Sequence, residues 1–365
     1  MAKTVNKKID VRKGMPSVEI SRHEFEKRFR ERFFDPAFDQ VDAEIAAIIE
    51  VAWQAYIGYN KNPRKRAAGK GYAEPNYELP VEWLAARAAI DKAAKQQADK
   101  KAPSRILLIN GSSRSDQTCP GEMSKTWRLV QLAQAAIQKE ARNFEVEVLD
   151  LSRLTSEAGR IIYPCKACVS TAQPLCHWPC SCYPNFALGQ VNDWMAEIYP
   201  KWVAAHGVMI VCPVNWYQAP SSLKLMIDRL VCADGGNPDP TSTHMKDAKK
   251  AKEIELAGWP YPRHLAGRAF AVVVHGDAAG VENLQRNLCS WLEDMNLYPS
   301  GHQSQIGRFV GYLEPYATSH QDLDEDMDFQ EDVQHAALAL VQAVKLLRKG
   351  ELRQPDAHLR ESRPK

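Results

Sequence analysis

The alternation of apolar runs and amphipathic stretches becomes regular after about residue 100 of this 365-residue chain. From there on, five apolar runs of strand length are each followed by a stretch with apolar residues at helical spacing. The runs are RILLIN (105–110), FEVEVLDL (144–151), GVMIVCPV (207–214), RAFAVVVHG (268–276) and the weaker SQIGRFVGYL (304–313). This βα alternation predicts an α/β fold with a doubly wound, five-stranded parallel sheet and helices on both faces.

The first hundred residues have a different pattern. Residues 41–58 carry apolar side chains at helical spacing and predict a helix that begins near Asp42 as its N-cap. Residues 80–101 predict a second helix, whose polar end is typical of a linker. We therefore expect a mainly helical N-terminal extension over 1–100. A main domain over 101–350 and a polar tail over 351–365 follow. Within the main domain, residues 163–184 form a Cys-rich loop and residues 234–265 an insertion.

Composition and charge narrow the class of protein. Hydrophobic residues make up 45% of the chain and charged residues 25%, which is typical of globular proteins. A net charge of +2 gives no reason to expect nucleic acid as a partner, and no apolar run reaches the length of a membrane span. The N-terminus has no apolar core of a secretory signal, so we expect a cytoplasmic protein whose thiols stay reduced.

The loop after the first predicted strand carries the first chemical signal. In GSSRSDQTCPGEMSKT (111–126) a Gly permits a tight turn, hydroxyl side chains follow, and a helix begins near its end. Helix N-termini attract anions, and the loop matches neither the P-loop nor the dinucleotide fingerprint. The pattern suits a phosphate monoester held by Ser112, Arg114, Ser124 and Thr126. The alternative is a helix start that is merely capped by Ser.

Three stretches resemble the NADPH-dependent FMN reductase family. Gly111-Ser112-Ser113-Arg114, followed by Ser124 and Thr126, is similar to that family's flavin-phosphate loop, although nine residues (115–123) lengthen it here. CPVNWYQAPSSLKLMIDRL (212–230) resembles the segment after the family's third strand, and VVVHGD (272–277) corresponds to its second ring-flanking loop. The resemblance covers roughly residues 104–310.

The resemblance implies a flavodoxin-like fold with bound FMN. Hydride would pass from NADPH or NADH through FMN to a small acceptor such as a flavin or quinone, in a homo-oligomer and without a catalytic acid or base. A non-catalytic electron carrier or redox sensor is the alternative. The residues that would border the flavin ring are Pro213, Val214, Asn215, Trp216, Tyr217, His275 and Gly276.

The segment CKACVSTAQPLCHWPCSCYP (165–184) holds five of the nine cysteines. Its spacing is compatible with an iron–sulfur cluster on four thiolates, with zinc on four thiolates or on three thiolates and His177, and with redox-active thiols. Simple packing of small apolar side chains is a further alternative.

The beginning of this segment partially resembles iron–sulfur flavoproteins, whose motif starts Cys-x2-Cys-x2-Cys. Cys165 and Cys168 match the first two positions, and Thr171 stands at the third. A [4Fe–4S] cluster would then use Cys165, Cys168, Cys176 and Cys180, with Cys182 as an equal choice for the last place.

Overall fold

The computed structural model describes residues 9–168 and 173–352 of the chain. It divides into two compact units, each assembled from segments that are distant in the sequence. The first unit comprises Met1–Ala85, Lys166–Asp193 and Asn237–Pro260, and the second comprises Ala86–Cys165, Trp194–Gly236 and Tyr261–Lys365. The predicted domain boundaries stay a prediction, and the tail over 353–365 lies outside the described residues.

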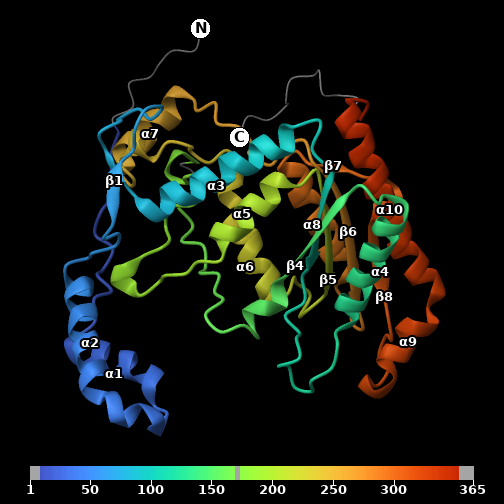
Figure 1. Ribbon diagram of the computed structural model, residues 1–365, viewed down its shortest axis with the longest axis horizontal. Coiled ribbons are helices and arrows are strands. Elements are labelled where there is room, and N and C mark those ends of the chain that lie inside the picture. The colour runs from blue at the N-terminus through green and yellow to red at the C-terminus, as the bar shows by residue number, and fades with distance from the viewer. Residues whose placement is uncertain (1–8, 169–172, 353–365) are drawn as a thin grey trace. The chain divides into compact units, whose positions relative to one another are not determined.

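A parallel sheet forms the centre of the second unit (Figure 1). Its main strands are β3 (Arg105–Asn110), β4 (Glu145–Asp150), β5 (Gly207–Pro213), β6 (Ala269–Gly276) and β8 (Gln305–Phe309). They lie in the order β4-β3-β5-β6-β8, which is the flavodoxin-like order 2-1-3-4-5. The predicted doubly wound sheet is therefore confirmed.

The edge strand of this sheet is broken into two pieces. A two-residue strand, β7 (Tyr298–Pro299), pairs with the start of β6, and β8 pairs with the rest of it. The short 3-10 helix η8 (His302–Ser304) separates the two pieces. The residues of β8 are half-buried or exposed, which agrees with the weak strand pattern of the fifth run.

Helices cover both faces of the sheet because strand side chains alternate between its two faces. Apolar side chains of α4 (Lys125–Glu140) and α10 (Met327–Lys349) pack in one core with Ile106, Leu108 and Met209 of the strands. The strand residues that alternate with these face the other side of the sheet and are buried as well. Helices α5 (Met195–Ala204), α6 (Ser221–Arg229) and α8 (Val281–Asp294) cover that second face (Figure 1).

The first unit contains the helical N-terminal region. Helices α1 (Arg22–Arg30) and α2 (Asp42–Ile57) meet through Phe25, whose ring centroid lies 5.3 Å from that of Trp53. Strands β1 (Lys65–Ala67) and β2 (Glu78–Pro80) pair antiparallel, α3 (Val81–Ala98) begins after β2, and α7 (Ala248–Ala257) lies in the insertion. Helix α2 was predicted from apolar spacing, whereas the strongly charged α1 was not.

No helix within residues 9–168 and 173–352 is both long and apolar enough to cross a membrane.

Candidate functional site

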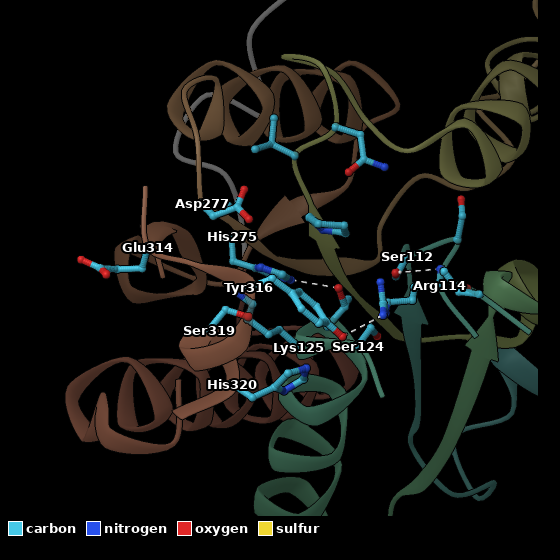
Figure 2. Close-up of a pocket in the computed structure, with 17 residues that line it drawn as sticks. Ser112, Arg114, Ser124, Lys125, His275, Asp277, Glu314, Tyr316, Ser319 and His320 are labelled. Carbon is cyan, nitrogen blue, oxygen red and sulfur yellow. Dashed lines mark hydrogen bonds between the residues drawn. The ribbon is translucent and has the colours of Figure 1, made fainter. Parts of the chain in front are cut away.

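A cavity of about 630 Å³ opens at the carboxyl ends of β3, β5 and β6 in the second unit. It includes the point between β3 and β5 where the strand order reverses, the usual place for a ligand in such sheets. Figure 2 shows its lining side chains. They are Ser112, Ser113, Arg114, Thr118, Ser124, Lys125, Thr126, Pro213, Val214, Asn215, His275, Gly276, Asp277, Glu314, Tyr316, Ser319 and His320.

The turn after β3 depends on a glycine packed against the neighbouring strand. A Cβ on Gly111 would lie 2.7 Å from Cys212 Cβ, closer than real side chains approach. The Gly111 N–H donates to the Val211 carbonyl at 2.8 Å and so extends the β3–β5 pairing. The chain then delivers Ser112 to the cavity, where its hydroxyl accepts the Arg114 backbone N–H at 3.1 Å.

Helix α4 begins at the cavity. Ser124 caps it, because its hydroxyl accepts the Trp127 N–H at 3.0 Å. The N–H groups of Lys125 and Thr126 belong to the first turn, which has no intrahelical acceptors for them, so this end of the helix favours an anion. The half-buried Lys125 ammonium adds a full positive charge to the cavity wall. Burial lowers its pKa, and Asp277 and Asp322 act in the opposite direction.

A neutral histidine lies beside this helix start. His275 Nε2 is 2.9 Å from the Thr126 hydroxyl, and both side chains are buried (Figure 2). Burial, with a smaller contribution from the Lys125 charge, lowers the pKa of His275 to about 3. The imidazole is therefore neutral at physiological pH, and the Thr126 hydroxyl is engaged with it.

Acid is expected to lower the free energy of unfolding, because the buried His275 disfavours its protonated form. The lowered folded-state pKa of His275 means that stability is fully present above the unfolded value of 6.5 and is lost as pH falls towards 3. At pH 5 the loss for this residue is about 2 kcal/mol. Urea unfolding at pH 7 and 5 measures it. His275→Gln should show a smaller loss between these pH values than wild type, and an equal loss would contradict the assignment.

Arg114, which was predicted to bind a phosphate, directs its guanidinium at groups of the protein itself. Its guanidinium donates to the carbonyls of Pro120 at 2.7 Å and Glu122 at 3.1 Å, and it lies over the Tyr316 ring. The Tyr316 hydroxyl in turn donates to the Glu122 carboxylate, which raises the pKa of Tyr316. Arg114 thus closes the excursion over 115–123 while still lining the cavity (Figure 2).

The loop after β5 separates the predicted ring residues into two groups. Pro213, Val214 and Asn215 line the cavity, whereas Trp216 and Tyr217 are absent from its lining and are 94% and 61% exposed. Reciprocal 2.9 Å backbone hydrogen bonds between Asn215 and Gln218 close a two-residue turn. Both central residues have positive φ, 46° and 64°, a conformation that usually selects Asn or Gly and is costly for aromatic side chains.

Sequence reasoning missed several lining residues. Lys125 stands between two predicted residues, and its place in the first helical turn was a usable signal. Glu314, Tyr316, Ser319 and His320 come from the segment after β8, which ends at the same sheet edge. No motif in that segment distinguishes them from ordinary surface residues.

The predicted metal ligands do not form a metal site. Within the described parts of the chain, no group of three or more His, Cys, Asp or Glu side chains is placed to hold a metal ion. The geometry therefore does not support the [4Fe–4S] prediction, and Thr171 lies outside the described residues.

The zinc alternative with His177 fails for a further reason. This buried side chain lies with Nδ1 2.5 Å from the Ser181 hydroxyl and Nε2 3.0 Å from the Thr243 hydroxyl. Both ring nitrogens are engaged, so neither is directed at a metal. Burial lowers the pKa of His177 to about 3, which is consistent with a neutral structural histidine.

Comparison with known proteins gives one family and several distant structures. The model of the NADPH-dependent FMN reductase family matches residues 104–310. A search of curated proteins found no match.

Three solved structures illustrate the distant similarity. RosB with bound 8-demethyl-8-formylriboflavin 5′-phosphate is 13% identical, with 68% of this chain and 82% of RosB covered and a TM-score of 0.46. A flavone reductase is 16% identical, with 69% and 67% covered and a TM-score of 0.41. An FMN-dependent NADH-azoreductase from Bacillus anthracis in complex with FMN is 12% identical, with 65% and 99% covered and a TM-score of 0.36. These similarities are too weak to support an inference of function.

Proposed function

The chain belongs to the NADPH-dependent FMN reductase family, and from that premise we propose that it passes hydride from NADPH or NADH through bound FMN to a small acceptor such as a flavin or quinone. Membership makes it an FMN-dependent oxidoreductase. The nicotinamide donor and the acceptor are the proposed part. The observation that carries the proposal is the cavity at the strand-order reversal, with a helix N-terminus and a lysine at its wall.

The polar end of the cavity fits a phosphate monoester. Lys125, Ser112 and the first residues of α4 are among the residues that line it. Together they offer one full charge, a helix dipole and short-range donors, which is the donor set that phosphate prefers. Ser124 and Thr126 would support this site mainly through the backbone, since their hydroxyls have partners within the protein.

The other end of the cavity fits a planar ring. Pro213 and Val214 supply apolar surface, and Gly276 leaves space where a Cβ would lie 2.4 Å from Val214 Cγ1. The Val214 N–H donates to the His275 carbonyl at 2.8 Å, so the two loops are fixed to each other. Bound FMN would supply the hydride chemistry itself, and these residues would hold its ring.

The exposed turn that begins at the lining residue Asn215 favours an aromatic molecule as the electron acceptor. Trp216 follows the lining residue Asn215 directly and places a large apolar ring in solvent. A costly backbone conformation that exposes two aromatic rings suggests a functional use for them. We propose that Trp216 stacks on planar acceptors as they approach the cavity.

Truncating this ring should affect acceptors selectively. Trp216→Ala is expected to raise the KM for a quinone by about 2- to 10-fold, the equivalent of an aromatic pair contact. The kcat with ferricyanide, which does not stack, should be unchanged, and Trp216→Phe should restore most of the loss. Equal KM changes for both acceptors would argue against stacking. Steady-state kinetics of the FMN-loaded protein measures these values.

Turnover tests the proposed reaction. The FMN-loaded protein is incubated with NADPH or NADH and a quinone, and nicotinamide oxidation is followed. Catalytic oxidation that requires both FMN and the quinone supports the reductase. Oxidation of at most one equivalent per chain would instead favour the electron carrier.

A further inference from the structure

The Cys-rich segment is fixed in place within the first unit. The Trp83 indole N–H donates to the Pro179 carbonyl at 2.8 Å, and the Lys61 ammonium donates to the Ser181 carbonyl at 2.7 Å. The Asn62 amide adds a bond to the Pro184 carbonyl at 3.3 Å. With the two contacts of His177, these bonds hold both sides of Cys180 and Cys182. The positions of these two thiols are therefore set by surrounding structure.

Two thiols of this unit are already in contact. Cys168 Sγ lies 3.3 Å from Cys182 Sγ, although fourteen positions separate them in the sequence. Cys180 also hydrogen-bonds the Cys182 thiol. A disulfide has an S–S length of about 2.05 Å, so the first pair needs only a small approach to form one. Both side chains are half-buried, which leaves them within reach of small molecules.

Cys182 is the proton-donating member of this pair. The hydrogen bond with Cys168 is the main cause that raises the pKa of Cys182 to about 11. Cys182 therefore keeps its proton at neutral pH, and Cys168 is the sulfur that receives its hydrogen bond. The Lys61 ammonium interacts with Cys180 and Cys182 and adds positive charge next to the pair. A thiolate beside a donor thiol and a cation is the arrangement that makes cysteines reactive.

We propose that Cys168 and Cys182 are a redox-active dithiol that small hydroperoxides oxidise to a reversible disulfide. The Cys168 thiolate attacks the peroxide O–O bond, which breaks and releases water or an alcohol while Cys168 becomes a sulfenic acid. Cys182 sulfur then attacks the Cys168 sulfur, the S–O bond breaks, and a second water leaves. Two thiols lose two electrons and two protons, and the peroxide takes them. A small dithiol reverses the step by exchange.

This site is independent of the proposed flavin chemistry. Its test uses the full chain as wild type, Cys182→Ser and Cys289→Ser, the last a matched control for a buried thiol on α8. Each protein is treated with hydrogen peroxide, alkylated and digested without reduction, and the peptides are mapped by mass spectrometry. Iron and zinc are measured on the same samples before treatment.

Wild type and Cys289→Ser are expected to yield a Cys168–Cys182 linked peptide that dithiothreitol removes. Titratable thiols in wild type should fall by two from the nine in the sequence. Cys182→Ser should accumulate a sulfenic acid at Cys168 that dimedone traps. The proposal is overturned if both thiols remain alkylated after peroxide, if Cys168 links to another cysteine, or if iron or zinc is bound stoichiometrically. The peptide map of the wild-type protein tests the proposal even if the Cys182→Ser protein fails to fold.

Discussion

Lys125→Met is expected to weaken FMN binding by about 10- to 100-fold and to leave riboflavin binding nearly unchanged. The half-buried Lys125 lines the cavity at the start of α4, and its ammonium has one long contact, 3.5 Å to the Val310 carbonyl, so we expect it to bind the phosphate. A hydrogen bond to a charged group contributes about 1.5–3 kcal/mol, which corresponds to that range of affinities. Only FMN carries the phosphate, so the loss should be specific to it. Titration of the apoprotein with each flavin, followed by flavin fluorescence, measures both affinities.

The same helix offers a matched control. Lys139 lies in the last turn of α4, at the end remote from the cavity, and is exposed. Lys139→Met removes an equal charge and should leave both affinities within about twofold, because exposed charges at a distance are screened by salt. An equal loss of riboflavin and FMN affinity in Lys125→Met would mean that this lysine supports the cavity's structure and not a phosphate.

Gly276→Ala is expected to destabilise the protein by about 1–3 kcal/mol, the usual cost of overpacking, and to weaken FMN binding as well. Gly276 ends the buried strand β6, and an added Cβ would lie 2.4 Å from Val214 Cγ1 and 3.0 Å from Val281 Cγ2. Val214 lines the cavity, so its displacement changes the shape of the proposed ring site. Urea unfolding and FMN titration measure the two effects.

A second substitution identifies the clash. Val214→Ala removes the methyl groups nearest to the new Cβ, so Gly276→Ala/Val214→Ala should be less destabilised than the sum of the single changes. Coupling of about 0.5–3 kcal/mol is usual for residues in direct contact. Strict additivity would show that the cost of Gly276→Ala arises elsewhere.

The sheet and its helices could be predicted from the sequence because burial imposes clear patterns. RILLIN and AFAVVVHG are apolar over most of their length, since strands β3 and β6 have both faces covered. Helix α8 presents Val281, Leu284 and Leu288 on one buried face. By contrast, α1 is rich in charged residues and buries no residue, so its sequence did not indicate a packed helix.

The candidate site could be predicted only where loops follow strands directly. Ser112, Pro213 and His275 line the cavity because each comes just after, or at the end of, a β-strand that reaches the same edge. Tyr316 and His320 join them through tertiary folding of a segment without a motif. Trp216 points outward because it lies in a turn with positive φ, a conformation that the sequence of this turn does not predict.

The geometry does not support the four-thiolate prediction, for a related reason. Spacing along the chain suggested one four-thiolate site, but it carries no information on which sulfurs meet in space. The structure brings Cys168 beside Cys182, which was an equal choice with Cys180 for the last ligand place.

The central claim is that this chain holds FMN in the cavity between β3, β5 and β6 and reduces it with a nicotinamide. An anaerobic absorption spectrum of the purified, FMN-supplied protein before and after NADPH or NADH tests this most directly. The account predicts structured flavin bands at one FMN per chain that bleach on addition of the nicotinamide. A protein that retains no flavin, or whose flavin bands persist until dithionite is added, would contradict it.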